Sequence, residues 1–222
     1  MFLEMIKHDI ISENKRFVVT ANPEIFMNSK NDADVQRLLL DESTCVVPDG
    51  ISIVKACKKM GIPVKERITG IDIANYLIKE GYRLGASFYL FGSKKNVIQS
   101  LINKLEISFP NINIVGFSDG YINEKDQVFD EISYLKPDIC LVALGVPQQE
   151  KLIYRHIGRF NKGIFVGIGG AFDVISGEKK RAPNVFIRFN LEWLYRIIRE
   201  PKRLKRFFSY NLKFIIFVLL NR

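Results

Sequence analysis

Asp49 is the residue of this sequence best suited to acid–base chemistry. It directly follows an apolar run at residues 44–48 and precedes Gly50. Partial burial at such a position would raise the pKa of the carboxyl group and still leave it able to accept a proton from a hydroxyl nucleophile. A Pro-Asp-Gly segment is also a common turn. Asp49 is therefore a general base or a turn residue, and the spacing alone favours the turn.

Three more polar residues follow apolar runs in the same way. Thr20 and Asn22 come after the run at residues 16–19, either as ligands at a strand end or as an Asx-type turn. Gln149 lies in the motif Gly-Val-Pro-Gln-Gln-Glu at 145–150, whose proline can open a helix. Gln149 could hydrogen-bond a sugar or a base, or it could belong to a solvated first helical turn.

The elements that must position these residues are short apolar runs that alternate with helical patterns. Runs at 16–20, 44–48, 88–91, 112–116, 139–144 and 164–167 are the predicted strands. One helix is predicted from Glu24 to Leu40, and another from about Ile73 to Lys79 with Asp72 as its N-cap. This alternation predicts a doubly wound, mostly parallel, Rossmann-like α/β sheet. Ligands bind such sheets at the carboxyl ends of the strands, where the polar candidates fall.

Composition excludes several classes of protein. A chain of 222 residues that is 47% hydrophobic and 26% charged is typical of a globular protein rather than a disordered or polytopic membrane protein. Three cysteines without a CxxC spacing and two scattered histidines predict neither disulfides nor a metal site. No GxGxxG motif occurs between a predicted strand and a predicted helix, and the P-loop motif GxxxxGK[ST] does not occur. No signal peptide is visible. We therefore expect no cofactor, no metal and a cytoplasmic protein.

Positive charge is concentrated at the C-terminus. Residues 179–222 contain twelve Lys or Arg and two Glu, whereas the remaining residues sum to a net charge of about −1. This distribution indicates an anionic partner for one end of the molecule. Without an accompanying nucleic-acid motif, we expect a membrane surface or a phosphate group rather than nucleic acid.

We call residues 191–222 the tail and expect them to form a basic helical appendage to an α/β core of residues 1–190. A helix over 191–200 and a second one from Pro201 would bring four arginines close to one face: Arg196, Arg199, Arg203 and Arg206. The apolar segment 207–220 is too short to span a bilayer. It predicts an interfacial anchor on anionic lipid, the alternative being a helix packed on the core.

A set of short motifs occurs in a characteristic order along most of the chain. They are Thr-Ala-Asn-Pro-Glu at 20–24, Pro-Asp-Gly at 48–50, Glu-Arg-Ile-Thr-Gly-Ile-Asp at 66–72, Gly-Val-Pro-Gln-Gln-Glu at 145–150, Gly-Ile-Gly-Gly-Ala-Phe-Asp at 167–173, Ser-Gly at 176–177, Arg-Ala-Pro at 181–183, and Leu-Glu-Trp-Leu-Tyr-Arg at 191–196 with Glu-Pro at 200–201 and Arg203. Together they resemble the WecG/TagA/CpsF family, glycosyltransferase family 26.

The resemblance implies an activity and a set of site residues. Members transfer a sugar, often N-acetylmannosamine, from a UDP-sugar to a polyprenyl-diphosphate-linked sugar at the cytoplasmic membrane face, with inversion and without a metal. The products serve cell-wall or surface-polysaccharide synthesis, such as teichoic acid. By motif position Asp49 would be the base and three residues would line the donor pocket: Thr20, Asn22 and Gln149. Three tail arginines would neutralise the diphosphate: Arg196, Arg203 and Arg206.

Two departures and two alternatives accompany this resemblance. Many members have a glycine where this chain has Ser52, and relatives usually carry a further strand before Thr20, so an edge strand would be short or missing here. The competing hypothesis is a non-catalytic nucleotide-binding or membrane-adaptor module. Apolar positions between the motifs leave a homo-oligomer open.

Overall fold

The structure, a computed structural model, describes residues 2–64 and 67–220. Glu66, the first residue of the motif at 66–72, lies outside the described residues. Within these ranges one sheet forms in the order β2-β1-β6-β5-β3-β4, with every neighbouring pair parallel. Its strands are β1 (Lys15–Ala21), β2 (Thr44–Pro48), β3 (Phe88–Gly92), β4 (Ile114–Ser118), β5 (Ile139–Ala143) and β6 (Gly163–Gly167). The predicted Rossmann-like α/β fold is confirmed.

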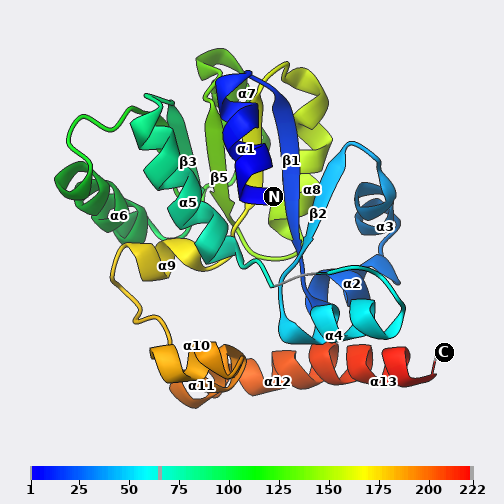
Figure 1. Ribbon diagram of the computed structural model, residues 1–222. Helices are drawn as coiled ribbons and strands as arrows, with labels where there is room; N and C mark the ends of the chain where they lie inside the picture. The colour runs from blue at the N-terminus through cyan, green and yellow to red at the C-terminus, as the bar shows by residue number, and fades with distance from the viewer. Residues whose placement is uncertain (1, 65–66, 221–222) are drawn as a thin grey trace.

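Helices cover both faces of the sheet, which explains why the central strands are apolar throughout (Figure 1). Successive residues point to opposite faces, so that Val18 joins one apolar cluster while Phe17 and Val19 join the other. The first cluster includes α1 (Phe2–Ile11), α5 (Gly70–Arg83), α6 (Lys95–Ser108) and α9 (Ala171–Ile175). The second includes α3 (Ala33–Leu40), α7 (Lys125–Leu135) and α8 (Gln148–His156), which a 3₁₀ turn (Ile157–Arg159) follows.

Several predicted helix boundaries were wrong. The single helix expected from Glu24 to Leu40 is two helices, α2 (Pro23–Ser29) and α3, because the Asp32 side chain accepts hydrogen bonds from the backbone of Asp34 and Val35 and starts a new helix. Thr69, not Asp72, caps α5, since its hydroxyl accepts a bond from the Asp72 N–H at 3.2 Å. The segment before β1 forms helix α1, which the sequence patterns had not predicted.

The tail lies along the carboxyl ends of the strands, below the sheet in Figure 1. After α10 (Asn184–Arg188) it contains α11 (Glu192–Arg199), α12 (Arg203–Phe207), a π-helical turn (Phe208–Leu212) and α13 (Lys213–Leu220). The second tail helix begins at Arg203 rather than at Pro201. Among the described residues no helix combines the length and apolar character needed to cross a membrane.

Part of the predicted membrane anchor is instead buried against the core. Phe214 is 3% exposed and packs with Ile53 and Ala56 of α4 (Ile51–Lys59). Its ring also lies 5.1 Å from that of Phe26, edge to face. Phe214 is therefore a docking residue for α2 and α4, and its assignment to a lipid surface was wrong. The face of the same helix opposite to Phe214, which includes Ile216, stays exposed.

Candidate active site

A cavity of about 1090 Å³ lies between the carboxyl ends of the strands and the tail. All seven residues singled out from the sequence line it. They are Thr20, Asn22, Asp49, Gln149, Arg196, Arg203 and Arg206. Arg199, the fourth arginine expected on the same face of the tail, lines it as well. The fold thus gathers residues that are more than 180 positions apart in the sequence into one site.

Asp49 occupies the turn that follows β2. Its N–H donates to the carbonyl of Ala21 at 2.6 Å, and Gly50 takes a φ of 110°, a conformation that favours glycine. In a turn aspartate the carboxylate normally accepts a backbone N–H, as Asp119 accepts that of Tyr121 at 2.8 Å. The Asp49 carboxylate accepts no hydrogen bond from any residue in the described ranges. Unlike a normal turn aspartate, Asp49 therefore does not use its carboxylate to stabilise the turn.

The surroundings of Asp49 change its acidity. Burial raises the pKa of Asp49 to about 6, against the opposing effect of the positive charges of Arg67 and Arg196. Glu192 and Asp72 add to the increase. A carboxylate with this pKa is ionised at neutral pH and is a better proton acceptor than an exposed aspartate.

Thr20 lies near the end of β1, and Asn22 is the first residue after this strand. The Thr20 hydroxyl donates to the Gly167 carbonyl at 3.4 Å, which ties β1 to β6. Asn22 caps α2, since its Oδ1 accepts bonds from the N–H groups of Glu24 and Ile25 at 3.0 and 3.1 Å. The amide Nδ2 group has no partner among the residues that the structure describes. Asn22 is therefore an Asx-type cap whose amino group lines the cavity.

Gln149 and Glu150 are buried, so the alternative of a solvated first turn for α8 is wrong. Gln149 is 1% exposed, and its Oε1 accepts bonds from the N–H groups of Gly145 and Gly169 at 3.1 and 3.0 Å. Its Nε2 donates to Glu150 Oε1 at 2.7 Å. A Cβ atom at Gly167 would lie 2.7 Å from this Nε2, so the glycine makes room for the amide. Gln149 links two loops that border the cavity.

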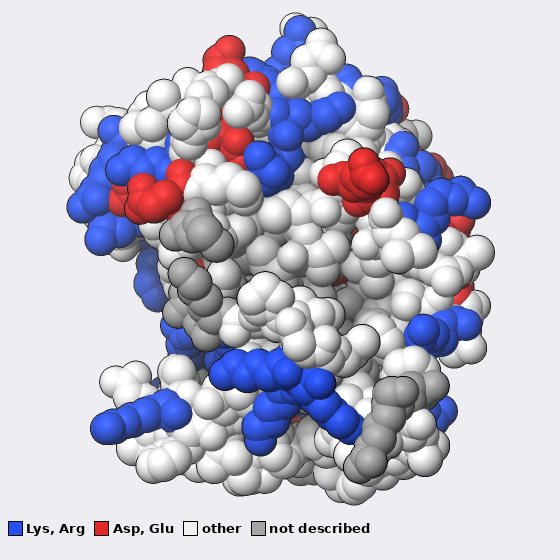
Figure 2. All heavy atoms as spheres, turned by 45° about the vertical axis from the view of Figure 1, so that its right-hand side comes forward, with Lys and Arg blue, Asp and Glu red and all other residues white. Residues whose placement is uncertain are grey.

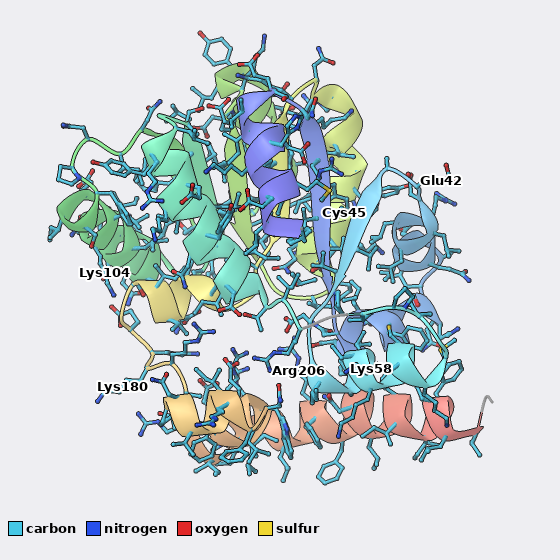
Figure 3. The ribbon with its side chains drawn as sticks, in the orientation of Figure 1. Glu42, Cys45, Lys58, Lys104, Lys180 and Arg206 are labelled. Carbon is cyan, nitrogen blue, oxygen red and sulfur yellow. The ribbon has the colours of Figure 1, made fainter. Side chains whose placement is uncertain are left out.

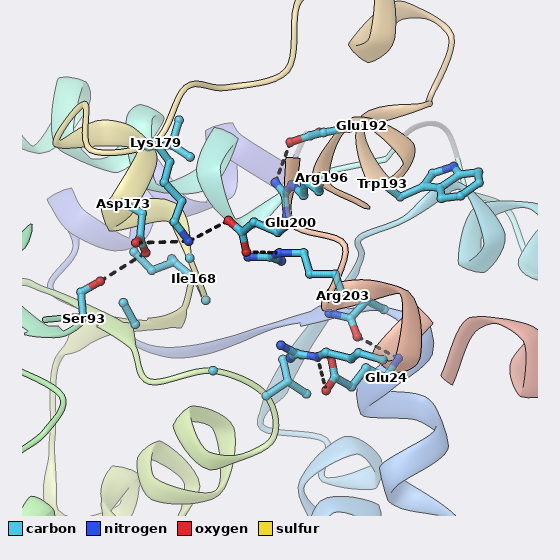
Figure 4. Close-up of a pocket in the computed structure, with 18 of the residues that line it drawn as sticks. Glu24, Ser93, Ile168, Asp173, Lys179, Glu192, Trp193, Arg196, Glu200 and Arg203 are labelled. Atoms are coloured by element: carbon cyan, nitrogen blue, oxygen red, sulfur yellow. Dashed lines mark hydrogen bonds and ion pairs between the residues drawn. The ribbon is translucent and has the colours of Figure 1, made fainter. Parts of the chain in front are cut away.

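The tail arginines reach the cavity as members of ion pairs. Arg196 pairs with Glu192 at 2.6 Å and Arg203 with Glu200 at 2.7 Å, as Figure 4 shows. The third pair crosses from the tail to the core, because Arg206 Nη2 lies 2.7 Å from a carboxylate oxygen of Glu24 on α2. Carboxylates therefore orient the guanidinium groups toward the cavity.

A second set of contacts extends from the tail to the β3–α6 loop. Lys179 Nζ lies 3.0 Å from Glu200 and 3.6 Å from Asp173, and the Ser93 hydroxyl donates to Asp173 at 3.4 Å (Figure 4). Charged and polar groups that pair with one another therefore line this part of the cavity.

A smaller cavity of about 260 Å³ adjoins the first, and Asp49 lines both. Arg67 lines only the smaller one, whereas Glu192 and Arg196 line the two. Sequence reasoning gave no role to Arg67 or Glu192, although both lie inside the quoted motifs. In the parts of the chain that the structure describes, no group of three or more His, Cys, Asp or Glu side chains is arranged to hold a metal ion.

Comparisons with known proteins agree with the motifs. Residues 1–222 match a family model described as the glycosyl transferase WecG/TagA/CpsF family. A Bacillus spizizenii protein is 38% identical over 209 residues, which is 94% of this chain and 81% of the relative. A Bacillus subtilis protein is 39% identical over 203 residues, 91% and 79% respectively. A Staphylococcus aureus protein is 34% identical over 196 residues, 88% and 76% respectively. Each relative is named N-acetylglucosaminyldiphosphoundecaprenol N-acetyl-beta-D-mannosaminyltransferase.

Proposed function

Because the chain belongs to the WecG/TagA/CpsF family and is therefore a glycosyltransferase, we propose that it transfers N-acetylmannosamine from a UDP-sugar to polyprenyl-diphosphate-linked N-acetylglucosamine. The relatives' names support the transferred sugar and the acceptor. The observation that carries the proposal is the Asp49 carboxylate, which faces a large cavity beside tail arginines. The product would serve wall teichoic acid or a related surface polysaccharide.

The chemical step follows from the position of Asp49. Its carboxylate removes the proton from the acceptor hydroxyl as the hydroxyl oxygen attacks the anomeric carbon of the donor sugar. The new glycosidic bond forms on the face opposite to the breaking bond, so the anomeric configuration inverts. The electron pair of the old bond leaves with the UDP diphosphate. The proton stays on Asp49 until solvent removes it.

The departing diphosphate needs positive charge, and we assign this role to Arg196, Arg203 and Arg206. A guanidinium matches two phosphate oxygens with parallel N–H donors. Glu200 and Glu24 hold Arg203 and Arg206 in the cavity before the donor binds. Phosphate oxygens of the donor would replace these carboxylates as the acceptors. This arrangement supports a transfer that proceeds without a metal ion or another cofactor.

The donor pocket would be built at the ends of β1, β5 and β6. The Asn22 amino group supplies a hydrogen-bond donor, and the Thr20 hydroxyl lies at the same rim. Gln149 acts here by holding the loops at Gly145 and Gly169 in place. We infer that these groups bind the sugar and nucleotide of the donor.

We further propose that the protein attaches peripherally to anionic lipid at the cytoplasmic face of the membrane. Exposed apolar side chains recur on one face of the last helices: Phe208, Leu212, Ile216 and Leu219. Basic side chains gather in the lower part of Figure 2. Figure 3 labels Lys58 on α4, the helix that packs against α13, and the neighbouring Lys59 donates to the Val218 carbonyl at 3.1 Å. An apolar face with nearby lysines binds anionic membranes by combined burial and electrostatic attraction.

One assay tests the proposed function. The protein would be incubated with a polyprenyl-diphosphate N-acetylglucosamine acceptor, a panel of UDP-sugars and excess EDTA, and UDP release would be measured. We expect acceptor-dependent UDP release that is fastest with UDP-N-acetylmannosamine, and an inverted anomeric centre in the product by NMR. Release from none of the sugars would contradict the proposed donor. Release that EDTA abolishes and Mg²⁺ restores would contradict the role of the arginines.

A further inference from the structure

Glu192 joins the tail to the core, and it lines the same two cavities as Asp49. It is the first residue of α11 and is only 5% exposed. Its Oε1 accepts a hydrogen bond from Arg196 at 2.6 Å, one helical turn later (Figure 4). Its Oε2 accepts one from Arg67 at 3.1 Å, across 125 positions of the sequence. One carboxylate thus connects a core arginine with a tail arginine.

This bridge forms part of the wall between the two cavities. Asp49, Glu192 and Arg196 line both cavities, and Arg67 lines the smaller one. A buried carboxylate is strongly destabilised unless cationic hydrogen-bond donors compensate it. The two guanidinium groups provide this compensation for Glu192, and Glu192 in turn keeps them from repelling each other. Losing Glu192 would leave two positive charges next to Asp49.

We infer that Glu192 is a positioning residue that holds Arg67 and Arg196 beside Asp49 and offsets their charge, so that Asp49 remains basic enough to accept the acceptor proton. The inference rests on the proposed role of Asp49 as the base. Arg67 and Arg196 alone would stabilise the ionised carboxylate and weaken it as a base. With Glu192 between them, the same arginines remain available to orient the bound substrate.

The charged groups that face Asp49 give the inference a direction. Arg67 and Arg196 lower the pKa of Asp49, whereas Glu192 and Asp72 raise it. Asp72 is itself paired with Arg181 at 2.6 Å. Replacing Glu192 or Arg67 therefore has opposite consequences for Asp49. If the bridge were only structural, replacing Glu192 and replacing Arg67 would have the same effect on Asp49.

The test is the pH dependence of kcat/KM in the full-length protein, with four variants. Glu192→Gln should move the midpoint of the acid limb to lower pH by about one unit, and Arg67→Gln should move it to higher pH by about as much. Glu192→Asp retains the charge but shortens the reach, so the midpoint should stay near that of the parent while kcat falls. Glu200→Gln, which removes the matching partner of Arg203, should leave the midpoint unchanged.

A second measurement does not depend on catalysis. The carboxyl ¹³C resonance of Asp49 would be titrated in each variant. We again expect the midpoint to move to lower pH in Glu192→Gln and to higher pH in Arg67→Gln. The inference is overturned if the midpoints of Glu192→Gln and Arg67→Gln move in the same direction, or if neither moves. If the parent shows no sugar transfer while the ¹³C titrations shift as expected, the proposed reaction fails and the charge coupling stands. If Glu192→Gln does not fold, the direction of the Arg67→Gln shift still decides.

Discussion

The two sides of the cavity are built in different ways. On the sheet side, Thr20, Asn22 and Gln149 are fixed by hydrogen bonds to backbone groups: Thr20 to the end of β6, Asn22 to the start of α2, and Gln149 to two loops. On the tail side, Arg203 and Arg206 are fixed by ion pairs with partly exposed carboxylates. Among the residues that the structure describes, neither large apolar cluster of the core includes one from the tail.

This difference separates two kinds of contribution. Backbone hydrogen bonds in a buried loop fix geometry before a substrate arrives, since each partner is costly to leave unpaired. Ion pairs near the surface contribute little stability and can exchange a carboxylate for a phosphate at small cost. We therefore expect the sheet side to supply the base in a fixed position and the tail side to respond to the charge of the diphosphate.

The largest expected effect is on the sheet side. Asp49→Asn removes the proton acceptor but keeps the size of the side chain, so turnover should fall by about 10²- to 10⁴-fold. The UDP-sugar affinity, measured by calorimetry, should stay close to that of the parent. Turnover within a few-fold of the parent would assign Asp49 to its turn and remove the contrast between the two sides.

The next effect concerns the tail side. Arg203→Ala removes a charged donor that faces the leaving diphosphate, which costs about 3–4 kcal/mol of transition-state stabilisation. Activity on a soluble acceptor analogue should fall by about 10²- to 10³-fold. Lys205→Ala on the same helix is the matched control, since Lys205 is exposed and does not line the cavity. Equal losses in both variants would indicate a general effect of positive charge.

A third prediction divides the tail itself. Replacing Leu212, Ile216 and Leu219 with serine should weaken binding to anionic vesicles by about tenfold or more, because their exposed apolar surface would contact lipid. The rate on a soluble acceptor should change less than twofold. Vesicle binding that survives, together with a change of oligomeric state by light scattering, would assign this face to a second copy of the chain. Phe214→Ser should instead lower the melting temperature.

The smallest effect concerns the burial of polar groups on the sheet side. Burial raises the pKa of Glu150 to about 7 from an ordinary value of 4.5, and its Oε2 has no partner among the described residues. The folded protein thus binds a proton that the unfolded chain has released, and stability falls as the pH rises between these values. Glu150→Gln removes this dependence.

The measurement is the difference in unfolding free energy between the Glu150→Gln variant and its parent. We expect this difference to shift in favour of the variant between pH 4.5 and 7, by roughly 1–3 kcal/mol. A difference that does not vary with pH would mean that the carboxyl group titrates normally. The sheet side would then be less tightly built than its burial indicates.

The sequence predicted the sheet side better than the tail side, for physical reasons. Apolar runs and polar strand ends are local patterns, and they located Thr20 and Asp49 correctly at the rim of the cavity. One of the two partners of Glu192 is Arg67, 125 positions earlier, and no local pattern encodes such a pair. The apolar run around Phe214 has the same composition whether it meets lipid or α4, so only the fold could decide.

Some missed features left a signal in the sequence. Ile6 and Ile10 are four positions apart and both are buried, which is the spacing of a helix packed on one face. Asp32 with a second acid at Asp34, followed by apolar Val35 and Leu38, is a normal helix start, and it marked the break between α2 and α3. The burial of Gln149 had no such signal, because it depends on the space that Gly167, at the end of β6, leaves for the amide group.

We propose that the tail completes the active site of a core that folds without it, and a protein ending at Tyr195 tests this proposal. Circular dichroism melting and sugar transfer to a soluble acceptor would be measured on the same preparation. We predict a cooperative melt, because both large apolar clusters are retained. Transfer should fall by at least about 10³-fold, because Arg196, Arg203 and Arg206, which we assign to the diphosphate, are removed. Full activity, or a chain that does not fold, would contradict the account.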